Sequence, residues 1–264
     1  MTKSESVLEM KEVTKQYDSD SSESLIAIQD IDLKIEKGEF VCILGPSGCG
    51  KSTLLNILAG FQPVTFGAAF FRGEEIKGPS WERGVVFQSP TLYPWLSVQE
   101  NVAFGPEVRG LKKEKIEKIS LDLLDEVGLK KDKDKAVFDL SGGMKQRVAL
   151  ARVLANQPEV ILMDEPLGAL DALTRLNMQG LIRNLWRETG NTVIMITHDV
   201  DEALSLATRL LVMSSQPGRI EESYRIDFTS TAFEREGQRV KVDDDYLELK
   251  DEILNHINTA NNKD

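Results

Sequence analysis

Short apolar runs, separated by polar and glycine-rich stretches, recur along this chain of 264 residues. The runs at 40–44, 160–163 and 192–197 are largely apolar, which is typical of strands that are buried on both faces of a parallel sheet. A helical spacing of apolar residues is present at 52–58 and at 148–154. The pattern therefore predicts an α/β fold in which buried strands alternate with helices.

Length and composition favour one domain with a small addition. With 41% hydrophobic residues, the chain has enough core for an α/β domain with a helical insert at about 90–158. We expect the domain to occupy 1–225. The remaining residues, 226–264, form a short tail, in which the apolar spacing at 246–257 predicts one amphipathic helix.

Several sequence features bear on where the chain resides and what it binds. No apolar run approaches the roughly 18 residues of a spanning helix, and the N-terminus lacks the apolar core of a signal peptide. Cys42 and Cys49 show no metal-binding spacing and fit a reducing cytoplasm. A formal charge of −11 argues against nucleic acid as a partner, since phosphate contacts need a basic surface. We expect a soluble chain that stays on the side where it is made.

A glycine-rich segment links the apolar run at 40–44 to the helical pattern at 52–58. It matches GxxxxGK[ST], and its glycines let successive N–H groups point at the β- and γ-phosphates of a nucleotide. Lys51 would neutralise phosphate charge, and the Ser52 hydroxyl would bind Mg²⁺. A turn without a ligand is the alternative, but it needs neither the Lys-Ser pair nor the preceding strand. We therefore predict binding of ATP or GTP by Gly45, Pro46, Ser47, Gly48, Cys49, Gly50, Lys51, Ser52 and Thr53.

A second motif, LSGGMKQR at 140–147, directly precedes the helical pattern at 148–154. Ser141 occupies an N-cap position, and Gly142 and Gly143 leave the first amides of the helix bare, which creates a second anion site. In isolation these residues would be only a helix cap. Because a Gln-Arg pair and an apolar strand with acidic residues follow, the motif resembles the signature sequence of the ABC ATPases.

The resemblance covers about 7–219 and implies both a fold and an assembly. The fold is an α/β, RecA-like P-loop NTPase core with a small antiparallel β-region before Gly45 and a helical insert. Two ATPase subunits would pair head to tail, as a homodimer or with a non-identical relative, so that the signature of one closes over the nucleotide of the other. The signature residues implied in contacting the nucleotide of the other subunit are Ser141, Gly142, Gly143 and Gln146. Asp171 is implied in a contact with the opposite protomer.

Two acidic residues follow the apolar run at 160–163. Asp164 stands at the carboxyl end of a buried strand, where a carboxylate can hold Mg²⁺ through water. Glu165 comes next and is placed to polarise the attacking water as a general base. The alternative is a pair of surface acids that cap a strand, and the surrounding motifs disfavour it.

Three further roles are implied by the resemblance. Gln88 matches the Q-loop glutamine, which would contact the metal and the attacking water; in isolation it would be a solvated side chain. His198 follows the run at 192–197 and matches the switch histidine that contacts the γ-phosphate, although a lone histidine there would cap the strand. Tyr17 matches the aromatic residue that stacks on adenine and favours ATP; a core or surface tyrosine is the alternative.

An aromatic segment at 89–104, SPTLYPWLSVQENVAF, bears on what the ATPase drives. Such a cluster is either local core or a surface for another protein. In ABC importers this segment receives the membrane subunit, and Tyr93 and Trp95 would be its anchors. Together with PLGALDALTR and QPGRI, the wording LYPWL resembles the ATPase subunits of nitrate, sulfonate and taurine importers. This implies polytopic permease subunits, an extracytoplasmic substrate-binding protein and a peripheral location at the cytoplasmic face of the cell membrane.

Other functions stay open on the sequence alone. A soluble ABC ATPase acting as a mechanical switch on ribosomes, Fe–S assembly or DNA would need no membrane partner, and an exporter would use the same motor. The residues at 137–139 also depart from the family, which usually has Tyr, His or Gln before the signature. If Cys49 lines the nucleotide pocket, ATP should protect it from thiol reagents.

Overall fold

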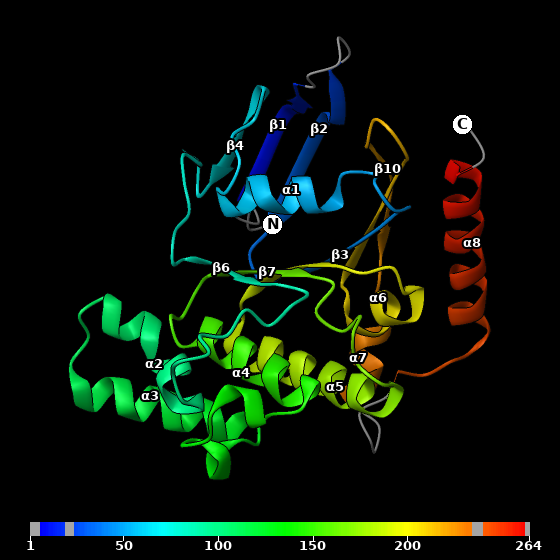
Figure 1. Ribbon diagram of the computed structural model, residues 1–264. Coiled ribbons are helices and arrows are strands. Elements are labelled where there is room, and N and C mark those ends of the chain that lie inside the picture. Colours follow the sequence, from blue (N-terminus) through cyan, green and yellow to red (C-terminus); the bar gives the residue numbers. More distant parts are fainter. Residues whose placement is uncertain (1–5, 19–23, 234–239, 262–264) are drawn as a thin grey trace, which may run out of the picture.

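A mostly parallel sheet of six strands forms the centre of the protein (Figure 1). The computed structural model describes residues 6–18, 24–233 and 240–261. The strand order is β10-β9-β3-β8-β7-β6, and every neighbouring pair is parallel except β9 and β10. The strands are β3 (Phe40–Leu44), β6 (Arg83–Val86), β7 (Val160–Asp164), β8 (Thr192–Ile196), β9 (Arg209–Met213) and β10 (Ile220–Arg225).

The three apolar runs of the sequence are central strands of this sheet. β3 and β8 are buried along their entire length, and β7 is buried up to Met163. Burial on both faces explains why these segments are continuous apolar runs without the alternation of half-exposed strands.

A second sheet is antiparallel and has the order β2-β1-β4-β5. Its strands are β1 (Ser6–Tyr17), β2 (Leu25–Glu36), β4 (Phe66–Phe71) and β5 (Glu74–Glu75). The prediction that this region lies before Gly45 is wrong for half of the strands, because β4 and β5 follow the P-loop helix. β4 returns to pair with β1, and β5 pairs with β4. Pairing between segments so far apart in the chain leaves no trace in a local pattern.

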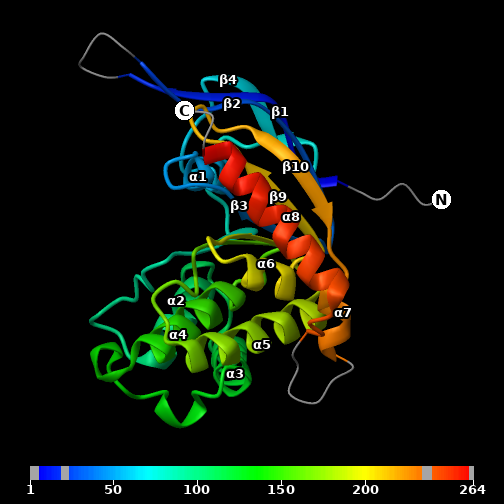
Figure 2. The ribbon, with the colours of Figure 1, turned by 90° about the vertical axis from the view of Figure 1, so that its right-hand side faces the viewer.

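Helices cover both faces of the parallel sheet. On one face, α1 (Lys51–Ala59) lies between the two sheets, where Leu54 and Leu58 share a buried cluster with Ile43 of β3 and Ile28 of β2 (Figure 1). On the other face lie α4 (Gly142–Leu154), α5 (Ala172–Thr189) and α6 (Val200–Leu206), as Figure 2 shows. The residues of these helices that pack against the sheet include Leu150, Leu154, Met178, Ile182, Ala203 and Leu204.

The segment predicted as a helical insert contains α2 (Val98–Val108), α3 (Lys113–Glu126) and α4, with short 3-10 turns at Lys130–Asp132 and Val137–Asp139. A capping box between Ser97 and Glu100 begins α2. Val102 of α2, Leu124 of α3 and Val148 of α4 belong to a core of their own. Since α4 contacts both this core and the sheet, it fixes the insert to the rest of the molecule.

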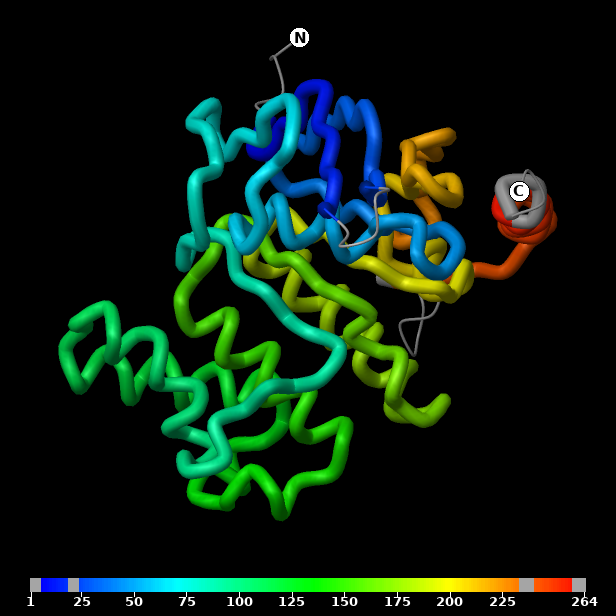
Figure 3. Tube along the Cα trace, turned by 45° about the horizontal axis from the view of Figure 1, so that its top comes forward, coloured from blue at the N-terminus to red at the C-terminus, as the bar shows by residue number. Residues whose placement is uncertain are grey.

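The tail contains two helices, α7 (Phe228–Phe233) and α8 (Asp244–Asn261). The amphipathic segment predicted at 246–257 lies within α8, whereas 234–239 and 262–264 of the predicted tail lie outside the described residues. Tyr246 and Ile253 are buried in the core beside the parallel sheet, so α8 is docked on its own chain (Figure 2). In Figure 3 this helix and the helical insert occupy opposite sides of the molecule. Within the ranges described above, no helix is long and apolar enough to cross a membrane.

Candidate nucleotide-binding site

The P-loop joins β3 to α1, as the sequence predicts. Gly50 is the N-cap of α1 with a φ of 89°, and a Cβ there would lie 2.4 Å from Ile28 Cγ2 and 2.7 Å from the carbonyl oxygen of Ala27, so only glycine fits. Gly50 has no side chain with which to cap the helix. The first N–H groups of α1 therefore remain available to an anion, at the end of the helix where the dipole is positive.

The ammonium group of Lys51 lies against the carbonyl side of the same loop. Lys51 Nζ is 2.8 Å from the carbonyl oxygen of Gly45 and 2.8 Å from that of Pro46, and the residue is buried. The nearest further acceptor is Cys49 Sγ, at 3.6 Å. Sulfur is a weak acceptor, so a phosphate oxygen would be a much better partner for the third N–H donor. The loop therefore fits a phosphate group.

Ser52 and Asp164 meet beside the P-loop. Ser52 Oγ donates to Asp164 Oδ1 over 3.3 Å. Partial burial raises the pKa of the Asp164 carboxyl, and the hydrogen bond from Ser52 opposes this. Within the described residues no group of three His, Cys, Asp or Glu side chains is arranged to hold a metal. Oxygen donors are those that Mg²⁺ prefers, and Mg²⁺ is usually bound by one or two carboxylates together with phosphates and water, so this pair fits an ion that arrives with a nucleotide.

The carboxyl ends of β6, β7 and β8 bring Gln88, Glu165 and His198 together. Gln88 Nε2 donates to Glu165 Oε2 over 3.2 Å, and His198 Nδ1 lies 3.6 Å from the same oxygen. The backbone of Glu165 has a φ of 43°, which is costly for a residue with a Cβ, and its N–H is held by the carbonyl oxygen of Ile196. Two side chains far apart in the sequence, Gln88 and His198, thus meet at the carboxylate of Glu165.

Tyr17 is joined to the P-loop helix by its hydroxyl group. The hydroxyl donates to Gln62 Oε1 over 2.5 Å and lies 3.4 Å from Thr53 Oγ1, while Lys15 Nζ stands 5.1 Å from the ring centroid. The ring is partly exposed. It thus lies beside the last residue of the predicted phosphate loop, where stacking on adenine stays a prediction.

The signature residues lie on the helical insert, at the start of α4. Ser141 Oγ accepts from the N–H of Met144, and Ser141 and Gly142 are exposed. A Cβ at Gly143 would lie 2.5 Å from Thr174 Cγ2, so this glycine also keeps α4 close to α5. The start of α4 is therefore open to another molecule.

Gln146 does not fit its predicted role. Only 3% of the residue is exposed, and its Nε2 donates to the carbonyl oxygen of Phe87 over 3.4 Å. A side chain enclosed within its own subunit does not reach a nucleotide held by another one. Gln146 instead fastens α4 to the residue that precedes Gln88.

Asp171 caps α5 and is exposed. Its Oδ1 accepts from the N–H of Thr174, and hydrogen bonds from Thr174 lower the pKa of the Asp171 carboxyl. The charge is therefore present at neutral pH on an accessible loop, which is what a contact with an opposite protomer requires.

Cys49 belongs to the P-loop through its backbone, but its thiol does not line the nucleotide pocket. The residue is 0% exposed and is part of the core between the two sheets. Burial raises the pKa of the Cys49 thiol, an effect that the nearby Lys51 opposes.

This burial reverses the expected result of thiol labelling. Native protein should react with a thiol reagent at neither of its two cysteines, since Cys42 is buried as well, whereas unfolded protein should expose both. Ellman titration before and after addition of denaturant measures the difference. Fast labelling of Cys49 that ATP blocks would contradict the placement of the thiol.

Two residues that matter to the site were not singled out in the sequence. Gln62 holds Tyr17, and Asn101 is fully buried, with its side chain bonded to the backbone of Tyr93, Leu96 and Ser97. Single amides in ordinary helical or loop stretches give no pattern by which to find them. Their roles depend on contacts that only the folded chain creates.

The fold and the site define a P-loop ATPase, and comparison with known proteins gives its family. A family model described as ABC transporter matches residues 28–168. The ATP-binding cassette MJ0796, in a dimeric post-hydrolysis state bound to ADP and Pi, is similar with a TM-score of 0.74 and 33% identity, over 83% of this chain and 99% of that one. The chain belongs to the ABC transporter family and is an ATP-binding, ATP-hydrolysing subunit, which confirms the predicted family, fold and activity.

Curated relatives match almost the whole chain. The taurine import ATP-binding protein TauB of Jannaschia sp. (strain CCS1) is 50% identical over 250 residues, which are 95% of this chain and 93% of the relative. TauB of Roseobacter denitrificans is 51% identical with the same coverage, and TauB of Escherichia coli (strain K12) is 45% identical over 88% of this chain and 91% of the relative. Taurine is one of the three substrates that the sequence resemblance named.

Proposed function

We propose that this chain is the ATPase subunit of an ABC importer for taurine or a related small sulfonate. The observation that carries the proposal is the identity of about one half to taurine import ATP-binding proteins along 95% of the chain. Nitrate and other sulfonates are the neighbouring choices within the subfamily, and the cargo itself is bound by other polypeptides. We propose that these are polytopic permease subunits and an extracytoplasmic substrate-binding protein, with this chain peripheral on the cytoplasmic face of the membrane.

The geometry supports a mechanism based on positioning. The N–H groups of α1 and the Lys51 ammonium hold the phosphates, and Tyr17 stacks on adenine. Ser52 and Asp164, with Gln88, would hold Mg²⁺, which would neutralise phosphate charge when bound. Glu165 takes the proton of the attacking water. The contacts from Gln88 and His198 keep the Glu165 carboxylate oriented toward that water.

We further propose that two copies of the chain form the active unit, with two equivalent sites. The exposed start of α4 and the exposed, charged Asp171 are available to a second protomer. The similar cassette MJ0796 is dimeric. The backbone N–H groups of Ser141, Gly142 and Gly143 and the Ser141 hydroxyl of one protomer would then donate hydrogen bonds to the nucleotide on the other.

An aromatic surface formed by Tyr93, Trp95 and Phe104 supports the proposed contact with a permease. Trp95 is 74% exposed, so the alternative that it is plain core is wrong. The Tyr93 ring lies 5.6 Å from that of Trp95 and 4.4 Å from that of Phe104, and the Arg152 guanidinium stands 5.2 Å from the Tyr93 ring. The buried side chain of Asn101 holds the backbone on both sides of Trp95 by hydrogen bonds to Tyr93 and Leu96. An exposed tryptophan held in a rigid aromatic frame is typical of a protein-binding surface.

Replacement of Tyr93 and Trp95 by Ala should release the chain from membranes without loss of nucleotide binding. The two rings anchor the proposed contact and lie outside the nucleotide site. The measurement is affinity capture of the tagged variant from detergent-solubilised native membranes, followed by mass spectrometry, together with a fluorescent-ATP titration. Recovery of permease subunits should fall at least about tenfold, as expected for loss of two interface anchors.

Phe66→Ala provides the matched control, since Phe66 is a 62% exposed aromatic residue on the antiparallel sheet. It should recover permease at the wild-type level. If the wild-type chain captures only soluble proteins, a mechanical switch without a membrane partner becomes the better assignment.

A further inference from the structure

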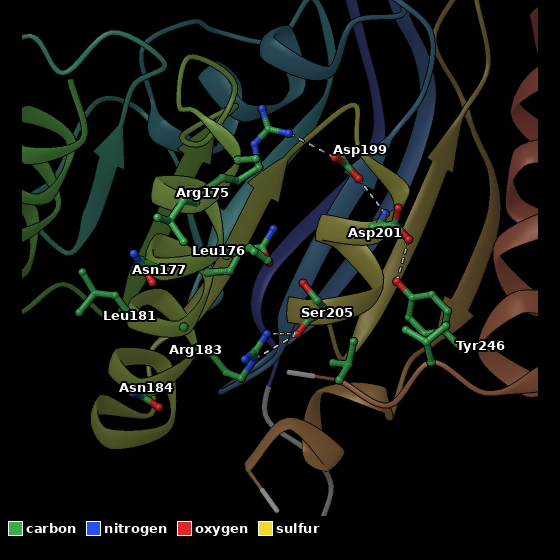
Figure 4. Close-up of a pocket in the computed structure, with 16 residues that line it drawn as sticks. Arg175, Leu176, Asn177, Leu181, Arg183, Asn184, Asp199, Asp201, Ser205 and Tyr246 are labelled. Carbon is green, nitrogen blue, oxygen red and sulfur yellow. Dashed lines mark hydrogen bonds and ion pairs between the residues drawn. The ribbon is translucent and has the colours of Figure 1, made fainter. Parts of the chain in front are cut away.

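One side chain outside the nucleotide site, Arg175, connects two of the segments that meet there. It lies in the first turn of α5, four residues after Asp171, and points toward the start of α6 (Figure 4). Arg175 and Asp199 lie on the wall of a hollow of about 860 Å³ between α5, α6 and the segment that leads into α8. The contacts of Arg175 link the loop that contains Asp171 to the loop that contains His198.

The first contact of Arg175 is with the loop that contains Asp171. Arg175 Nη2 donates to the carbonyl oxygen of Leu170 over 3.2 Å, and the backbone N–H of Arg175 donates to the carbonyl oxygen of Asp171 over 2.8 Å. Leu170 is buried. The guanidinium is therefore bound to the backbone directly before Asp171, whose carboxylate is exposed.

The other contacts of Arg175 are with two acids that follow His198 in the chain, Asp199 and Glu202. Nη1 lies 3.7 Å from Asp199 Oδ2, and Nε lies 3.4 Å from Glu202 Oε1. Glu202 is buried and accepts a 2.6 Å hydrogen bond from Thr197 Oγ1. Both neighbours of His198 in the chain are thus held, directly or through Glu202, by the same guanidinium.

The far side of α6 is fastened to the C-terminal helix. Asp199 Oδ1 accepts from the N–H of Asp201, Asp201 Oδ1 accepts from the Tyr246 hydroxyl over 2.9 Å, and Asp201 Oδ2 accepts from Lys250 Nζ over 2.7 Å. Figure 4 shows this row of contacts from Arg175 to Tyr246. Because α8 is bound to the start of α6, α6 holds the loop that contains His198 in place. Arg175 connects α6 to α5.

We infer that Arg175 is a positioning residue for ATP hydrolysis, which holds the His198 loop and the Asp171 loop in a fixed relation. Arrival of a second protomer at Asp171 then fixes where His198 stands relative to Glu165. A planar guanidinium with five N–H donors can contact Leu170, Asp199 and Glu202 at once, whereas an ammonium on a flexible stem cannot. The inference rests on the proposed roles of His198 and Asp171 and is independent of the cargo.

A double-mutant cycle tests this inference on the purified full-length chain. Arg175→Gln should lower steady-state ATP turnover about tenfold, the size of effect typical for a coupling residue. Binding of a fluorescent ATP analogue should change less than about twofold, because no phosphate contact is lost. The double variant Arg175→Gln/His198→Ala should be no slower than His198→Ala alone, since Arg175 acts through His198.

Asn177→Ala is the matched control, because Asn177 is exposed on the same helix and lines the same hollow. It should turn over at the wild-type rate. Arg175→Lys keeps the charge and should give an intermediate rate; if the Gln variant fails to fold, the Lys variant completes the cycle. The thermal midpoint of each variant separates a positioning role from a purely structural one. A purely structural role would lower the thermal midpoint and ATP binding together, whereas a positioning role lowers turnover alone.

Two outcomes would overturn the inference. One is wild-type turnover in Arg175→Gln, and the other is a double variant in which the two losses multiply. If His198→Ala itself turns over at the wild-type rate, the inference fails with the proposed role of His198. In that case the ATPase assignment is unaffected, because it is tested separately through Glu165.

Discussion

Glu165→Gln should reduce ATP hydrolysis by at least about 100-fold, the lower end of what a general base contributes. The amide has nearly the shape of the carboxylate, so the side chain can keep its place beside Gln88 and His198, but it cannot accept a proton from water. ATP binding should be preserved because the proposed phosphate contacts come from Lys51 and α1. Since hydrolysis would release the closed dimer, the variant should accumulate as a dimer when ATP is added.

Size-exclusion chromatography with light scattering, with and without ATP, measures the trapped dimer, and phosphate release measures turnover. Glu74→Gln is a suitable control, because Glu74 is exposed on the short strand β5, and it should behave as the wild type. Unchanged turnover in Glu165→Gln would remove Glu165 from the role of base.

Lys51→Met should weaken the binding of ATP about 100-fold. The substitution keeps most of the aliphatic stem but removes the charged donor, and a hydrogen bond to a charged group contributes up to about 3 kcal/mol. This corresponds to an affinity loss of about 100-fold. Calorimetric titration with a non-hydrolysable ATP analogue gives the dissociation constant directly.

The loop itself also depends on Lys51, whose ammonium bridges the carbonyl oxygens of Gly45 and Pro46. The thermal midpoint should therefore be measured beside the affinity. Lys77→Met is the control, since the Lys77 side chain is 81% exposed, and it should bind ATP normally. Wild-type affinity in Lys51→Met would mean that the α1 amides alone hold the phosphates.

The site was predictable from the sequence to the extent that its chemistry lies in contiguous motifs. The pattern GxxxxGK[ST] between a buried strand and a helix predicts both the P-loop and its place in the fold. The positions of Asp164 and His198 at the ends of apolar runs place them at one edge of the sheet, because parallel strands end on the same side. Each of these inferences needs only local spacing.

The rest depends on contacts between distant segments. Nothing local distinguishes Gln146, which is enclosed in its own subunit, from a residue that faces a nucleotide, and the thiol of Cys49 points into the core although its backbone lies in the loop. The pairing of β4 with β1 joins segments on either side of the P-loop. Arg175 is equally ordinary in the sequence, and only the folded chain places it between two loops of the site.

The proposal that this ATPase drives import is tested most directly by uptake of radiolabelled taurine into cells that lack the chain. Reintroduction of the wild-type chain should restore uptake, whereas the Glu165→Gln variant, expressed at the same level, should not. Competition with unlabelled sulfonates and with nitrate would rank the candidate substrates in the same assay. Equal taurine uptake in cells with the wild-type chain, with the variant and with neither would contradict the account.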